Sequence, residues 1–164
     1  MKTAESGVTA KSLRRMPVVA LEQWLLRAMD SLAAKLGRAP RLPEHLETGI
    51  RGEEEAFFHL RRLGNTIIAR QWKSVKRRGD LDLVGWSDDH LCFIEVKART
   101  RRDWAPAESS VDDDKKRMLR VMARAFLRRC DDAEKIQTRF DVVSVYLLGE
   151  SAEFEVTKGA FAWA

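Results

Sequence analysis

Hydrophobic residues recur along the chain with two different periods, and these periods predict an order of helices and strands. Residues 18–36 and about 44–63 repeat hydrophobic positions every three or four residues, as on one face of an α-helix, and a glycine follows each segment. Alternating or continuous apolar runs predict a strand at 65–72, two more within 78–99, and another at 138–148. With a further helix between the last two regions, this order predicts an α/β protein with a mixed central sheet flanked by helices.

The third helix and the chain ends complete this outline. Ser109 or Ser110 could cap the helix, and the acidic residues 112–114 suit its positive N-terminal end. Residues 1–16 have no hydrophobic period, and a final segment around 153–164 is too short to assign, although it could add a small strand. We therefore divide the chain into an N-terminal tail, helix and linker over 1–43 and one domain over 44–164.

Acidic residues interrupt the two strands of "RGDLDLVGWSDDHLCFIEVKAR", residues 78–99. If the polar turn is "SDDH", the hairpin register places Asp82 opposite Glu95 and Asp80 opposite Lys97. Side chains two positions apart share a face of a strand, so all four groups are expected on one patch of the sheet. The register depends on this turn, because a slip of one residue would reverse the faces.

Two carboxylates opposite each other repel, so a partly buried pair either shares a proton or holds a cation. Asp82 and Glu95 are therefore candidate ligands of a hard divalent ion, Mg²⁺ or Mn²⁺. Lys97 beside them could orient or help to deprotonate a water, or neutralise developing charge, which supplies the parts for phosphodiester hydrolysis. The structural alternative is an ordinary ion pair between Asp80 and Lys97, with Asp82 and Glu95 on an exposed sheet face.

A further acid falls on the second predicted helix. Its hydrophobic stripe continues onto Glu53, whereas the neighbouring Glu54 and Glu55 are predicted to rotate away from it. The stripe consists of Leu46, Ile50, Phe57 and Leu60. An acid on an apolar face makes Glu53 a further candidate for the site.

The chain is basic, which favours a polyanionic partner. Its 164 residues carry a net charge of +5, so nucleic acid is the first expectation and an anionic membrane surface the second. Two basic runs flank the acidic strands and are predicted to contact phosphates, although each could equally be a solvated loop: Arg77, Arg78, Arg99, Arg101 and Arg102. The two cysteines have no metal-ligand spacing, and no apolar run reaches membrane-spanning length or resembles a cleaved signal, so we expect no membrane association and a cytoplasmic protein.

Five sequence blocks in order resemble the YraN family, which is grouped with Holliday-junction-resolvase-like and other PD-(D/E)xK nucleases. The blocks are "GIRGEEEA" at 49–56, "RGDLDLV" at 78–84, "FIEVKAR" at 93–99, "VDDDK" at 111–115 and "RFDVV" at 139–143. The resemblance implies a restriction-endonuclease-like core in 44–164.

The resemblance also assigns roles to individual residues. It implies that Asp82, Glu95 and Lys97 occupy the catalytic positions, that Glu53 is the acid of the first core helix, and that Lys115 is a basic residue of the following helix, which we expect to contact nucleic acid. The sequence departs from the family at Asp80, where glutamate is usual.

Three hypotheses follow, and the first is preferred. The chain is a Mg²⁺- or Mn²⁺-dependent nuclease acting on nucleic acid, with DNA, branched or single-stranded, expected before RNA. The alternatives are a nucleic-acid-binding module that keeps this fold without cutting, and a protein that binds a partner through residues 18–36. A monomer and a homodimer both remain open.

Overall fold

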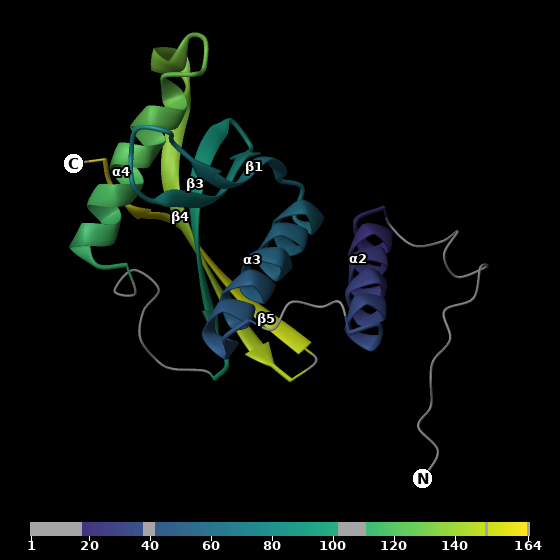
Figure 1. The fold of residues 1–164 in the computed structure, drawn as a ribbon. Helices are drawn as coiled ribbons and strands as arrows, with labels where there is room; N and C mark the ends of the chain where they lie inside the picture. The colour runs from purple at the N-terminus through teal and green to yellow at the C-terminus, as the bar shows by residue number, and fades with distance from the viewer. Residues whose placement is uncertain (1–17, 38–41, 102–110, 150, 164) are drawn as a thin grey trace. The chain divides into compact units, whose positions relative to one another are not determined.

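The computed structural model describes residues 18–37, 42–101, 111–149 and 151–163 (Figure 1). The chain divides into two compact units, Met1–Arg41 and Leu42–Ala164. In the first unit, α2 (Val18–Lys35) is the helix that the hydrophobic period predicts. Within the part of the chain that the structure describes, no helix is long and apolar enough to cross a membrane.

The second unit contains the remaining elements, in the predicted order. They are α3 (Glu44–Arg62), β1 (Thr66–Lys73), β2 (Asp80–Ser87), β3 (His90–Arg99), α4 (Asp113–Leu127), the short 3₁₀ helix η2 (Ala133–Lys135), β4 (Gln137–Leu148) and β5 (Ser151–Phe161). The last strand is a full member of the sheet and is longer than the small strand expected from the sequence.

The five strands form one mixed sheet in the order β1-β2-β3-β4-β5. All neighbouring strands run antiparallel except β3 and β4, which are parallel. Parallel neighbours need a crossover connection, and α4 lies in the segment that joins these two strands. The α/β fold with a mixed sheet and flanking helices is therefore confirmed.

The predicted hairpin register is also confirmed where β2 pairs with β3. The paired positions run from Ser87 and His90 to Leu83 and Ile94, in the register expected from a turn within "SDDH". The turn itself is tighter than predicted, because residues 87 and 90 already pair. Asp88 adopts φ +52, a left-handed conformation that aspartate tolerates better than most residues.

Two separate hydrophobic clusters join the helices to the sheet, which lies between α4 and α3 in the view of Figure 1. Residues of β3 alternate between them, which places the clusters on opposite faces. The cluster with α4 includes Leu91, Phe93, Leu119, Met122 and Phe140. The cluster with α3 includes Ala56, Leu60, Cys92, Ile94 and Val143. The sheet is therefore a central layer between α3 and α4.

The predicted buried stripe of α3 is partly wrong. Leu46 and Ile50 are 48% and 47% exposed, whereas Glu55, which was expected to point away, is buried. The buried positions of this helix begin at Gly52, so its first two turns are not covered by the sheet. A helical period alone cannot show where along a helix its support begins.

Gly52 explains how α3 approaches the sheet. A Cβ added at this position would lie 2.3 Å from the Cβ of Ala98 on β3. Only glycine therefore permits this contact between helix and strand. The close approach carries Glu53, the next residue, to the end of β3.

The N-terminus of α4 differs from the expectation. Its cap is Asp112, whose Oδ1 accepts a hydrogen bond from the backbone N–H of Lys115 at 2.7 Å. Aspartate and serine are comparably good N-cap residues, so residue type alone could not show whether Asp112 or one of the preceding serines caps the helix. The two predicted cap serines, Ser109 and Ser110, lie outside the described residues, as does Arg102.

Candidate functional site

The candidate site lies where β2 and β3 separate. Their ladder ends at Leu83 and Ile94. Beyond this point, β2 continues to pair with β1 as far as Asp80, and β3 continues to pair with β4 as far as Arg99. We call this separation the fork; its two edges are residues 80–82 and residues 95–97.

Asp82 replaces a ladder hydrogen bond with one from its side chain. The backbone N–H of Val96 donates to its Oδ2 at 2.8 Å. Aspartate side chains compete with backbone partners in this way. The extrapolated cross-strand pairs, Asp82 with Glu95 and Asp80 with Lys97, are thus not members of the ladder, although the acids still lie at the same fork.

Glu95 is buried and has a lysine at each oxygen. Its Oε1 lies 3.0 Å from Nζ of Lys97, and its Oε2 lies 3.0 Å from Nζ of Lys115. The Lys115 ammonium is therefore the partner of Oε2. Because a carboxylate oxygen can accept more than one donor, Oε2 still has capacity for a further donor or a cation.

The pKa of Asp82 shows that the two carboxylates interact. The pKa of Asp82 is raised from 3.8 to about 7. Burial is the largest cause and the nearby charge of Glu95 the second, while the Val96 N–H and the charge of Lys115 act in the opposite direction. The charge of Glu95 thus disfavours ionisation of Asp82, as the sequence argument expected for neighbouring carboxylates. A cation at this position would remove that penalty.

Lys115 comes from α4 and faces several acids of the fork. Burial lowers its pKa, but Glu95, Asp82 and Asp80 outweigh burial, and the pKa is raised overall. The residue expected to contact nucleic acid thus also balances charge inside the candidate site. Sequence spacing could not show this, because the contact joins a helix to a strand that lies 20 positions earlier in the chain.

Glu53 lies close enough to affect the fork but is held by a neighbour. Its Oε2 accepts a hydrogen bond from Nε2 of Gln71 at 3.0 Å, and its charge makes the smallest of the contributions that raise the pKa of Asp82. Gln71 has φ +45 and lies between Arg70 and Trp72, which pair with Leu83 and Leu81 on either side of Asp82. Sequence reasoning missed Gln71, whose one visible signal is a polar residue within an apolar strand.

The donor set fits a hard cation. Asp82 and Glu95 offer oxygen ligands, and Glu53 lies near them. Within the described ranges, no three or more His, Cys, Asp or Glu side chains are gathered as a ready protein cage for a metal. Mg²⁺ does not require one, because it is commonly bound by one or two carboxylates together with waters and substrate phosphates. The residues present therefore fit Mg²⁺ or Mn²⁺ better than a metal that needs several nitrogen or sulfur ligands.

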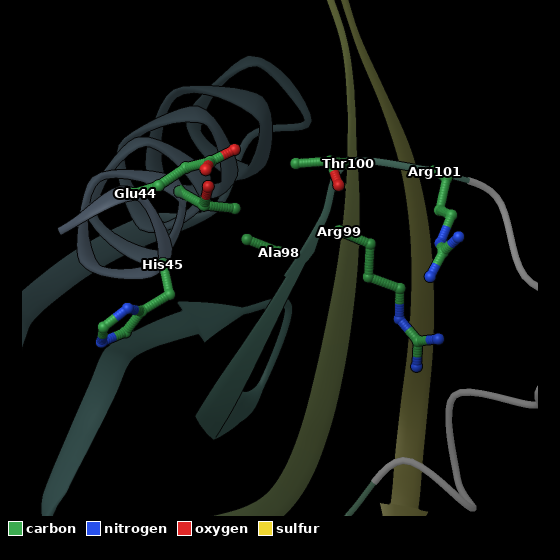
Figure 2. A pocket seen from close by; sticks show the side chains of 7 residues that line it. Glu44, His45, Ala98, Arg99, Thr100 and Arg101 are labelled. Carbon is green, nitrogen blue, oxygen red and sulfur yellow. The ribbon is translucent and has the colours of Figure 1, made fainter.

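The predicted basic residues border two different hollows. Arg99 and Arg101 line a hollow of about 560 Å³ at the end of β3, together with Glu44, His45, Thr48, Ala98 and Thr100. Figure 2 shows Ala98 directed toward α3, whereas the two arginine side chains extend away from that helix. Arg77 lines another hollow beside α4, and Arg78 is exposed. The described members of the two basic runs thus border separate hollows, and their gathering at one edge stays a prediction.

Comparisons with known proteins converge on one family. The model of "Uncharacterised protein family UPF0102" matches residues 52–145. A UPF0102 protein of Koribacter versatilis (strain Ellin345) is 49% identical over 140 residues, which cover 83% of this chain and 96% of the relative. A UPF0102 protein of Solibacter usitatus (strain Ellin6076) is 42% identical over 137 residues, which cover 84% and 97%. The matched region contains the fork, and these descriptions state no activity.

Proposed function

This chain belongs to the UPF0102 family, and from the fork we propose that it is a metal-dependent nuclease with a restriction-endonuclease-like core. One observation carries the proposal. Two carboxylates share the fork with two lysines at the point where β2 and β3 separate, and burial together with the charge of Glu95 raises the pKa of Asp82. Such a combination suits the hydrolysis of a phosphodiester, whose transition state develops negative charge.

Asp82 and Glu95 would hold Mg²⁺ or Mn²⁺. The ion would supply charge neutralisation and Lewis acidity at the phosphodiester. Asp82 is positioned for this role by its hydrogen bond from Val96, which fixes one carboxylate oxygen. Glu53 supports the site from α3 and is itself oriented by Gln71.

Lys97 is the candidate catalytic lysine. Its ammonium group contacts Glu95 while its side chain remains 29% exposed, so it can face both the carboxylate and an incoming substrate. A positioned ammonium at this place would orient the attacking water and stabilise charge on the phosphate. Lys115 has a similar exposure of 27% and adds a second positive charge beside the same acid.

A specific observation favours a second candidate function, a nucleic-acid-binding module without cleavage. Both lysines already lie 3.0 Å from Glu95, so the buried acid is neutralised by the protein itself. Asp80 also stands where the resembling family usually has glutamate. A binding module would use the basic surface and leave the fork as a structural ion cluster.

A cleavage assay separates the two functions. We expect the wild type to cut at least one of a panel of branched, single-stranded and duplex substrates with Mg²⁺ or Mn²⁺. Under single-turnover conditions, Lys97→Ala should lower the rate on the order of 10² or more, because a positioned catalytic group is lost. The matched control is Lys116→Ala, which removes a helical lysine paired with the exposed Asp113.

Binding is measured on the same substrates. Lys97→Ala should retain most of its affinity, because other basic residues share the phosphate contacts. Equal cleavage by the wild type and Lys97→Ala would refute the mechanism and indicate a contaminating nuclease. Binding without cleavage on every substrate would establish the second function instead.

A further inference from the structure

A second hollow lies beside the C-terminal end of α4. It has a volume of about 480 Å³ and is formed by the connection between β1 and β2 and by the C-terminal end of α4. Its lining contains one aromatic residue, four cations and no acid: Trp72, Ser74, Val75, Lys76, Arg77, Ala125, Arg128 and Arg129.

The four cations lack the acidic partners that several other basic residues have. Elsewhere, Lys116, Arg117 and Arg139 each pair with an acid. Across the described structure, by contrast, no ion pair or side-chain hydrogen bond involves the charged groups of the hollow, which belong to Lys76, Arg77, Arg128 and Arg129. All four of these side chains belong to exposed residues.

Like charges around one hollow repel unless an anion is present. Surface cations are usually interspersed with acids, so an acid-free group indicates a surface suited to a polyanion. The hollow also has a rigid wall, because Trp72 packs edge-to-face on Phe126 with ring centroids 5.2 Å apart. The cations therefore surround a fixed, partly apolar surface.

The position of the hollow relates it to the fork. α4 reaches both, since Lys115 contacts Glu95 near its N-terminus and Arg128 lines the hollow just past its C-terminus. Thirteen residues of helix at about 1.5 Å each place Lys115 and Arg128 roughly 20 Å apart along α4. The phosphates of one strand of duplex DNA advance about 3.4 Å each, so this separation corresponds to about six nucleotides.

We propose that this hollow binds the phosphate backbone of a nucleic acid about six nucleotides from the position held at the fork. The binding surface consists of Lys76, Arg77, Arg128 and Arg129. The identification of the fork as the reacting position rests on the proposed function, but the phosphate contact itself does not. The hollow would bind nucleic-acid phosphates beside the reacting position, and the acids at the fork would not contact those phosphates.

The test compares two double variants of α4 that remove the same charge. Arg128→Gln/Arg129→Gln removes two cations of the hollow, and Lys116→Gln/Arg117→Gln removes two that are paired with their own acids. Fluorescence anisotropy with a labelled 24-base-pair duplex, in EDTA, gives the affinity over a range of salt concentrations. Melting curves check that both variants are folded.

We expect the hollow variant to reduce the slope of log affinity against log salt by about 1.8, or 0.9 for each lost phosphate contact. The control should change the slope much less. The affinity of the wild type for short duplexes should rise as their length increases past about six base pairs, and this gain should be smaller in the hollow variant.

Two outcomes overturn the inference. One is that the two double variants have equal salt slopes and equal affinities. The other is that the hollow variant binds duplexes of every length more weakly by the same factor. A separate cleavage assay keeps the proposed function distinct. If the wild type cuts nothing while the hollow variant loses the expected slope, the nuclease proposal fails and this inference stands.

Discussion

Replacing Asp82 with asparagine tests the electrostatics of the fork directly. The pKa of Asp82 is about 7 in the folded protein and 3.8 for the ordinary group. Since the folded value is the higher one, the native state binds this proton more tightly than the unfolded chain does. The free energy of unfolding should therefore fall as the pH rises from about 4 to 7 and stay level above that range.

The size of the effect follows from these two values. Their difference, at about 1.4 kcal/mol for each tenfold change in proton affinity, gives an upper bound of roughly 4 kcal/mol. Partial solvent access reduces this loss. In the Asp82→Asn variant, the new amide cannot ionise but can still accept the hydrogen bond from Val96, which becomes weaker by about 1 kcal/mol.

We therefore expect Asp82→Asn to raise the melting temperature above pH 7 by several degrees, with about 10 °C as the upper bound for a protein of this size. The measurement is a set of thermal melts between pH 4.5 and 8.5 in EDTA. Asp88→Asn is the matched control, because it removes an exposed acid at the opposite end of the same hairpin. Mn²⁺ should stabilise the wild type at pH 8 and not Asp82→Asn. Identical pH profiles for the wild type and Asp82→Asn, or a less stable variant at pH 8, would refute the reasoning.

Two further substitutions test the packing and charge balance around the fork. Lys115→Met should destabilise the metal-free protein by a few kcal/mol, because it leaves the buried Glu95 with one cation. If the Lys115 ammonium competes with a metal ion for Glu95, calorimetry should find tighter Mn²⁺ binding in Lys115→Met than in the control Lys116→Met. Weaker Mn²⁺ binding in Lys115→Met would contradict this competition. Gly52→Ala should lower the free energy of unfolding by about 1–3 kcal/mol in denaturant melts, because its Cβ would meet Ala98. Adding Ala98→Gly to the same chain should restore much of this stability. An equal loss in the double variant would show that the close contact is not responsible.

The sequence predicted the parts of this fold that depend on local pattern. Alternation and the turn predicted the register of β2 with β3 as far as Leu83 and Ile94, beyond which Asp82 and Glu95 lie. Five sequence blocks predicted the YraN family, and the match to UPF0102, which is the same family, confirms it. In each case a short segment carries the information. The match covers the region in which the candidate site lies.

Other features could not be predicted because they join distant segments. The ion pair of Lys115 with Glu95 depends on where α4 lies on the sheet, and the contact of Gly52 with Ala98 depends on how closely α3 approaches β3. The exposed residue Leu46 shows the same limit, since helical periodicity does not indicate which turns are supported. The roles of Glu53, Asp82, Glu95 and Lys97 in catalysis stay predictions.

The fork also explains why acids are tolerated inside this sheet. In a continuous ladder, Asp82 and Glu95 would face each other directly and repel. Here the side chain of Asp82 takes the N–H of Val96, so the strands separate without leaving that buried donor unpaired. Each strand keeps its other partner, β1 for β2 and β4 for β3, so the separation sacrifices few hydrogen bonds. The same side chain that ends the ladder thus makes room for the two lysines, and a site for charged chemistry forms at little cost to the sheet.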